Sequence, residues 1–300
     1  MSQNGACRYR VEHYTAYRYS EPVMLSHQQL HLTPRILDYQ PIQEHEVVIE
    51  PAPTQRRNRT DAFGNPVTEI AIETAHSALD IIAKSIVTVT ERRAIDVDTV
   101  PAWESVRDGL AYSAGWHPEP AILDATHFLF ESPYARVKRT LRAYAGDCFE
   151  PGWPILAAAA ALMAKIHGEF KFDAAATSVT TPVMKFFEQK RGVCQDFTHL
   201  MISCLRSTGL AARYVSGYLL TRPAPGKPRR VGTDVSHAWV SLFVPEIGWI
   251  DFDPTNNVMP ALEHITLGWG RDFSDVTPLR GVINGGGEQT LEVKVSVEAL

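Results

Sequence analysis

Three residues in the second half of the chain carry the side chains that a thiol nucleophile needs. Cys194 is followed 43 residues later by His237 and, after a further 16 residues, by Asp253. A thiolate is a strong nucleophile, an imidazole exchanges protons near neutral pH, and a carboxylate can orient that imidazole by accepting its second ring proton. These residue types in this order indicate covalent catalysis by Cys194, with His237 as the proton carrier and Asp253 as its orienting group.

The residues around Cys194 predict that it begins a helix. Thr180-Thr-Pro182 is typical of a helix start, with Thr as the cap and Pro in the first turn, and Arg191-Gly192 ends that helix. The residues from Cys194 to Ser207 then have helical spacing before a stop at Gly209. Unpaired N–H groups and the positive dipole end at a helix start favour a thiolate, so this position suits a nucleophile.

His237 and Asp253 are predicted to lie on consecutive strands. Residues 211–220, 235–244 and 248–252 are rich in β-branched and aromatic side chains. If the last two strands form a hairpin, the imidazole and the carboxylate lie side by side. The Pro/Gly/Arg-rich stretch 222–230 between the first two strands is expected to be an exposed loop.

The rest of the chain predicts an α+β protein with three parts. Alternating polar and apolar residues indicate a β-rich, sandwich-like domain at 1–97. Apolar spacings of three and four indicate a helical connector at 98–152. Residues 153–300 are expected to form the catalytic core, in which the nucleophile's helix packs on an antiparallel sheet and the alternating stretch 290–297 adds a C-terminal strand.

Composition excludes several classes of protein. The 300 residues include 29 Lys+Arg and 34 Asp+Glu, a net charge of −5 without a basic region, so we expect no nucleic-acid or membrane partner. The polar start lacks the apolar segment of a signal peptide, which favours a cytoplasmic location. The four cysteines form no C-x-x-C pair, so neither a disulfide scaffold nor a structural zinc site is expected. We expect no cofactor, and the oligomeric state stays open.

Four segments of the second half contain the three candidate residues or lie between them: Gly192-Val-Cys-Gln-Asp-Phe-Thr-His-Leu200, Ala212-Arg-Tyr-Val-Ser-Gly-Tyr218, Ser236-His-Ala-Trp-Val240 and Gly248-Trp-Ile-Asp-Phe-Asp-Pro-Thr255. These segments resemble the transglutaminase-like core of the papain-type thiol enzymes. Two regions outside the core, Tyr9 to Arg35 and Gly270 to Gly281, are similar to the N-terminal β domain of bacterial transglutaminase-like proteins and to the segment that follows their core.

The resemblance implies that Cys194 is the nucleophile, His237 the general base and then acid, and Asp253 the residue that fixes the His tautomer. Attack on a peptide or protein amide would give a thioester. Water would complete a peptidase or amidase reaction, and an amine would complete a transglutaminase reaction. We expect hydrolysis, because neither an acceptor site nor the calcium-loop pattern of animal transglutaminases is recognisable.

The resemblance also suggests supporting residues. The oxyanion needs two donors, of which the backbone N–H of Cys194 supplies one. Animal transglutaminases use an indole N–H, which suggests Trp153, and papain-like enzymes use a Gln side chain, which suggests Gln195, although its position differs from theirs. Asp196 either supports the site or interacts with the helix dipole.

Two alternatives belong to other classes. One is a non-catalytic peptide-binding module that inherited the fold. The other is a metal hydrolase with Cys194, His199 and His237 as ligands, although no paired ligand motif is present. His199 is expected to pack or to hydrogen-bond rather than to catalyse, and Cys204 is expected to be buried.

Overall fold

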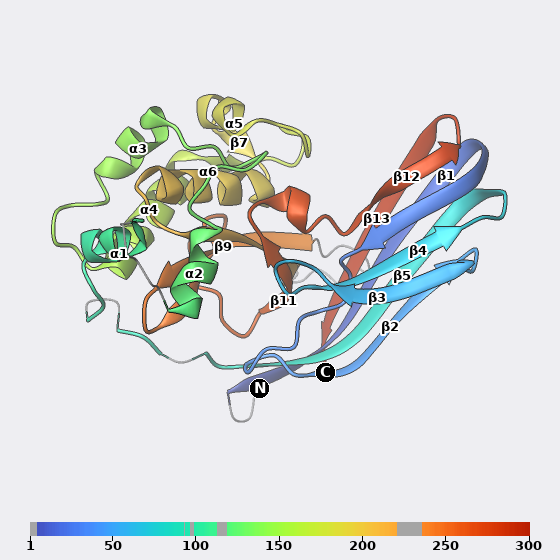
Figure 1. Ribbon diagram of the computed structural model, residues 1–300, viewed down its shortest axis with the longest axis horizontal. Coiled ribbons are helices and arrows are strands. Elements are labelled where there is room, and N and C mark those ends of the chain that lie inside the picture. The colour runs from blue at the N-terminus through green and yellow to red at the C-terminus, as the bar shows by residue number, and fades with distance from the viewer. Residues whose placement is uncertain (1–4, 93, 97–98, 113–118, 221–235) are drawn as a thin grey trace, which may run out of the picture.

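The computed structural model describes residues 5–92, 94–96, 99–112, 119–220 and 236–300. The predicted loop at 222–230 lies outside this part of the chain. Figure 1 shows two lobes: a long antiparallel sheet, and a smaller sheet covered by helices. None of the described helices has both the length and the apolar character needed to cross a bilayer.

The first lobe is a seven-stranded sheet in which the long strand β1 is central. The main strand order is β2-β5-β1-β4-β3, and β12 and β13 also pair with β1. Its strands are β1 (Ala6–Leu30), β2 (Ile42–Glu50), β3 (Gln55–Thr60), β4 (Pro66–Ile72), β5 (His76–Thr90), β12 (Leu279–Gly285) and β13 (Gln289–Ala299).

Alternation of side chains explains why β1 forms a strand with one buried face. Tyr9, Val11 and His13 are buried, whereas Arg10 and Glu12 between them are exposed. Successive side chains of a strand point to opposite faces, so this pattern places the apolar residues of β1 on the inner face of the sheet.

The C-terminal strand corrects the predicted domain boundaries. Residues 153–300 were expected to form one catalytic core, but β13 pairs antiparallel with β1, with Val297 opposite Val11. Val295 and Val297 are buried in a cluster that also contains Ile265 of the second lobe. The alternating pattern therefore predicted a strand correctly, but its apolar face is buried at the junction of the two lobes and its hydrogen bonds go to the N-terminal sheet.

The second lobe combines helices with a four-stranded antiparallel sheet in the order β10-β9-β8-β11. A short parallel pair, β6 and β7, precedes helix α6. The elements are α1 (Trp103–Leu110), α2 (Pro120–Thr126), α3 (Arg139–Gly146), α4 (Ile155–Glu169), β6 (Lys171–Phe172), α5 (Val183–Gln189), β7 (Arg191–Gly192), α6 (Cys194–Ser207), β8 (Ala212–Leu219), β9 (Ser236–Val244), β10 (Gly248–Phe252), β11 (His264–Gly270) and the short 3₁₀ helix η1 (Phe273–Asp275).

The region expected as a connector at 98–152 contains helices α1 to α3, which pack into this second lobe. Val106 of α1 and Leu141 of α3 are buried in the same apolar cluster as Leu200 of α6 and Val240 of β9. Helices α1 to α3 are therefore part of the lobe that carries α6, because their apolar faces are buried against the same core.

A polar junction joins the two lobes. The side chain of Asn65, in the loop before β4, accepts from the Trp269 N–H at 3.0 Å and donates to the Trp269 carbonyl at 2.8 Å. Arg35 donates to the same Asn65 amide oxygen and lies over the Trp269 ring, with its Cζ atom 3.6 Å from the ring centroid. Arg213 of β8 is also close, 3.7 Å from that centroid. These contacts fix β11 against the first lobe.

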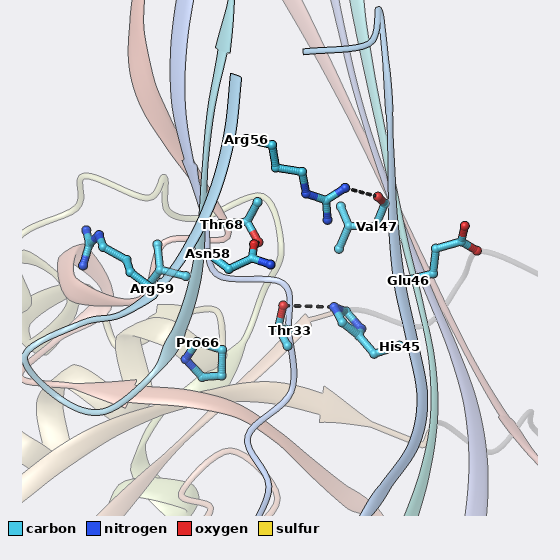
Figure 2. Close-up of a pocket in the computed structure, with 10 residues that line it drawn as sticks. Thr33, His45, Glu46, Val47, Arg56, Asn58, Arg59, Pro66 and Thr68 are labelled. Atoms are coloured by element: carbon cyan, nitrogen blue, oxygen red, sulfur yellow. Dashed lines mark hydrogen bonds between the residues drawn. The ribbon is translucent and has the colours of Figure 1, made fainter. Parts of the chain in front are cut away.

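A hollow of about 410 Å³ lies within the first lobe, between β2 and the β3–β4 hairpin. Figure 2 shows the Arg56 guanidinium donating across it to the Val47 carbonyl, and His45 within hydrogen-bond distance of Thr33. Arg59 pairs with Glu69. The Cys194, His237 and Asp253 side chains do not line this hollow and belong to the second lobe.

Candidate active site

Cys194 is the first residue of α6, as the glycine stop before it predicts. Helix α5 ends in the left-handed residue Lys190, and the short strand β7 leads directly to the helix start. The Sγ atom of Cys194 lies 4.0 Å from the carbonyl oxygen of Ser236, the first residue of β9, and the Cys194 side chain is only partly buried. The thiol is therefore accessible, next to the positive end of the helix dipole and beside the strand that carries His237.

Asp196 holds the entry to α6 in place. Its Oδ2 atom accepts from the Val193 N–H at 2.8 Å and from the Thr177 hydroxyl at 2.6 Å. Burial is the largest influence on this carboxyl and raises its pKa, although both hydrogen bonds lower it. Asp196 therefore caps the helix that presents Cys194 and ties the segment around Thr177 to it, and a role of Asp196 in catalysis stays a prediction.

His237 and Asp253 lie side by side, as the predicted hairpin requires. Strands β9 and β10 pair antiparallel, with Val240 opposite Phe252, and Asp253 follows directly after β10. The Nε2 atom of His237 lies 2.7 Å from Oδ2 of Asp253, and both residues are buried. Since Nε2 is engaged by the carboxylate, Nδ1 is the ring nitrogen left for the hydrogen bond that His237 makes with Cys194.

The electrostatics of this group favour a charged imidazole. Burial, the largest influence, lowers the pKa of His237, but the hydrogen bonds and charges of Asp253 and Cys194 outweigh it and raise the pKa to about 10. Burial likewise opposes ionisation of Asp253, but the hydrogen bonds from His237, His264 and Asn256 hold the pKa of its carboxyl far below the usual range. An imidazolium balanced by a carboxylate and facing a thiol is the arrangement that generates a thiolate nucleophile.

Two further residues bind the Asp253 carboxylate, and neither was singled out in the sequence. The Nε2 atom of His264, on β11, lies 3.1 Å from Oδ2, and the Asn256 side-chain amide donates to the same oxygen at 2.7 Å. The backbone N–H groups of Thr255 and Asn256 donate to Oδ1 at 3.0 and 3.2 Å. The polar turn after Asp253 is a local signal for Asn256, whereas no local signal marks His264.

Gly217 makes the approach of β11 possible. It lies on β8, directly opposite His237, and a Cβ atom there would come within 2.4 Å of the Trp239 ring and 2.2 Å of the Ile265 carbonyl oxygen. The Trp239 ring occupies this space, donates from Nε1 to Asp251 at 2.9 Å, and meets the His264 ring edge-on with centroids 5.2 Å apart. A side chain at 217 would separate these rings.

The two residues proposed for the oxyanion site make other contacts. The Gln195 side-chain amide donates to the Val179 carbonyl at 2.9 Å. Trp153 precedes α4, where its backbone bonds with Trp103 of α1 and with Glu150. The β6–β7 pair next to Cys194 follows the other end of α4, so the helix separates Trp153 from the nucleophile. The backbone N–H of Cys194 stays the predicted oxyanion donor.

His199 is buried within the core, as expected. Its Nε2 atom accepts from the Phe273 N–H at 3.2 Å, and its ring stacks on Tyr134 with centroids 5.3 Å apart. Burial lowers the pKa of His199. The set Cys194, His199 and His237 is therefore not assembled as a metal site. In the described ranges the one group with metal-ligand spacing is His237, Asp253 and His264. Both histidines hydrogen-bond to Asp253, which accounts for the short distances between the three side chains.

Family models match both lobes. The bacterial transglutaminase-like N-terminal region matches residues 9–88, and the transglutaminase-like superfamily matches residues 142–254, which include Cys194, His237 and Asp253. An uncharacterised protein of Mycobacterium tuberculosis is 37% identical over 99% of this chain and 94% of its own length. The chain belongs to the transglutaminase-like superfamily. An uncharacterised protein of Mycobacterium leprae is 32% identical to this transglutaminase-like chain, over 98% of the chain and 99% of its own length.

A solved structure shares the fold of this transglutaminase-like chain over its whole length. The crystal structure of a candidate cysteine protease from Cytophaga hutchinsonii covers 100% of the chain and 92% of its own, with a TM-score of 0.74 and 18% identity. A protein-glutamine gamma-glutamyltransferase of Pseudomonas aeruginosa is 34% identical over 31% of this chain and 15% of its own length. The expected fold, a β-rich N-terminal region with a transglutaminase-like core, is confirmed.

Proposed function

We propose that this chain is a cysteine enzyme that transfers the acyl group of a peptide or protein amide through a thioester on Cys194, with water as the usual acceptor. The observation that carries the proposal is the placement of His237, whose Nε2 atom is held by Asp253 at 2.7 Å while Cys194 hydrogen-bonds to the ring. Burial lowers the pKa of the core residue His199, whereas the contacts with Asp253 and Cys194 raise the pKa of His237.

The first half-reaction uses the groups in a fixed order. The Cys194 thiolate attacks the amide carbonyl carbon, forming a C–S bond, and the backbone N–H of Cys194 donates to the oxyanion. As the C–N bond breaks, the His237 imidazolium gives the proton on Nδ1 to the leaving amine. The products are a thioester and a neutral imidazole, still oriented by Asp253.

The second half-reaction decides the type of enzyme. Neutral His237 accepts a proton from the attacking water or amine and becomes the imidazolium again, the C–S bond breaks with the Cys194 thiolate as the leaving group, and the imidazolium–thiolate pair is restored. Water gives an acid product and a peptidase or amidase. A primary amine gives a new amide, which is the transglutaminase reaction. This second candidate is favoured by the similarity to a protein-glutamine gamma-glutamyltransferase, which is 34% identical over 31% of this chain.

Mass spectrometry of a peptide and protein pool tests both candidates. The pool is incubated with the wild type or with Cys194→Ala, in the presence of a labelled primary amine. We expect new peptide termini or deamidated glutamine without label, and only with the wild type. Label on glutamine side chains would establish amine transfer instead, and identical products with Cys194→Ala would refute the thioester mechanism.

The matched control is Cys7→Ser, since Cys7 is also a partly buried free cysteine but lies in β1 of the first lobe. This variant should give the wild-type products. A pool that neither the wild type nor Cys7→Ser changes would favour the alternative of a non-catalytic peptide-binding module.

A further inference from the structure

Two imidazoles share one carboxylate oxygen in this site. Oδ2 of Asp253 lies 2.7 Å from Nε2 of His237 and 3.1 Å from Nε2 of His264. The two histidines come from strands that are not neighbours, because β8 separates β9 from β11 in the sheet. Their meeting at one atom is therefore a product of the tertiary fold, and sequence order gives no hint of it.

The protonation of His264 follows from its partners. Asp253 is held ionised by its hydrogen bonds, so it can only accept, and Nε2 of His264 must carry the proton that it receives. The Nδ1 atom of His264 is covered and has no hydrogen-bond partner among the described residues, so the contact with Oδ2 of Asp253 is the side-chain hydrogen bond that the ring makes.

We infer that His264 is a positioning residue for the proposed reaction: a donor that fixes Oδ2 of Asp253 between two rings, so that His237 is held with Nδ1 toward Cys194. The inference rests on the proposed function, since it acts only through the Cys194–His237 pair.

The surroundings of His264 fit a fixed donor. Asp253 is fully buried and His264 is 4% exposed. The Trp239 ring stands edge-on to His264, and Asp251 holds Trp239 in turn through its indole N–H. Asn256, the third side-chain donor to Oδ2 beside the two histidines, is exposed and free to exchange its bond with water. His264 is therefore the donor whose loss the solvent cannot replace.

The assay is the second-order rate constant for alkylation of Cys194 by iodoacetamide at pH 6, which needs no knowledge of the substrate. His264→Phe keeps an aromatic ring against Trp239 but removes the donor. We expect a fall of about tenfold, the size of one hydrogen bond to a charged group. His264→Gln places an amide N–H near the position of Nε2 and should recover at least half of the wild-type rate.

A double-mutant cycle separates positioning from general support of the fold. In an Asp253→Asn background, His264→Phe should lower the rate less than twofold, because the carboxylate through which it acts is gone. The matched control is His76→Phe, since His76 is also buried and edge-on to an aromatic ring, that of Tyr19, but lies in the first lobe. It should react at the wild-type rate.

Two results would overturn the inference alone: a wild-type rate in His264→Phe, or an equal fall in both backgrounds. If wild-type Cys194 itself reacts no faster than free cysteine, the proposed function and the inference both fail, and the wild-type measurement distinguishes that case from the other two. If His264→Phe does not fold, His264→Gln is compared in the wild-type and Asp253→Asn backgrounds instead. Asp253→Asn alone should slow the alkylation of Cys194, and failure of His264→Gln to recover at least half of the wild-type rate would contradict the inference.

Discussion

His237 donates through Nε2 to Asp253 at 2.7 Å, from a strand that pairs directly with the strand ending at Asp253. The hairpin of β9 and β10 sets this distance, and it leaves the second ring nitrogen, Nδ1, for the thiol at the start of α6. The orientation of the catalytic imidazole is thus a consequence of strand register. Changes that disturb this register should therefore alter the reactivity of the Cys194 thiol.

Gly217→Ala should destabilise the protein and disable the site, because its new Cβ atom would come within 2.2 Å of the Ile265 carbonyl oxygen and 2.4 Å of the Trp239 ring. We expect a loss of about 3 kcal/mol in the free energy of unfolding, measured by urea denaturation. The control is Gly168→Ala in α4, where nothing lies within 4 Å of the added methyl group. That variant should gain about 0.5 kcal/mol from helix propensity. Equal stability of the two variants would contradict the assigned packing.

The order of thiol labelling should follow exposure and environment. Iodoacetamide should label Cys194 first in the native protein, and Cys204, which is 0% exposed, only after unfolding. Burial also raises the pKa of the Cys204 thiol, so little thiolate is available there. Peptide mapping at increasing reaction times checks the order, and labelling of Cys204 before Cys194 would contradict it.

The pH dependence of turnover should reflect the loss of the proton from the His237 imidazolium. Its pKa is raised to about 10, so the imidazolium that protonates the leaving amine is present at lower pH and is lost as the pH rises through about 10. In Asp253→Asn the hydrogen bond and charge that raise this pKa are weakened, so the alkaline loss of kcat/KM should begin at lower pH. The profile is measured with the best peptide found in the pool experiment. An unchanged alkaline limb in Asp253→Asn would mean that Asp253 does not control His237.

Asn65→Ala should loosen the junction between the lobes. The side chain makes two hydrogen bonds with the Trp269 backbone and accepts one from Arg35. Their loss leaves buried polar groups of β11 unpaired, and we expect about 3 kcal/mol less stability in urea denaturation. Asn58→Ala is the matched control, since Asn58 accepts one bond from Thr68 on the β3–β4 hairpin, and it should cost under about 1 kcal/mol. Equal losses would show that the junction has no special role.

The sequence predicted those parts of the site that depend on local patterns. A glycine stop followed by helical spacing placed Cys194 at the start of α6, and consecutive β-rich segments placed His237 on β9 and Asp253 at the end of β10. In each case the signal lies within about ten residues of the functional side chain, where backbone propensities and turn chemistry act.

The remainder depends on contacts between distant segments. His264 reaches Asp253 across β8, which needs the sheet order and the missing side chain at Gly217. The pairing of β13 with β1 joins the two ends of the chain. Alternating valines predict that a strand forms, but its pairing partner is selected by tertiary packing, which explains why residues 290–297 were assigned to the wrong lobe.

The central claim is that Cys194 and His237 form a thiolate–imidazolium pair. The most direct measurement is the alkylation rate of Cys194 from pH 4 to pH 9, in the wild type and in His237→Gln. We expect the wild type to react at pH 6 at least about tenfold faster than free cysteine, and His237→Gln to lose this advantage. A wild-type profile that coincides with that of free cysteine, or one that His237→Gln leaves unchanged, would contradict the claim.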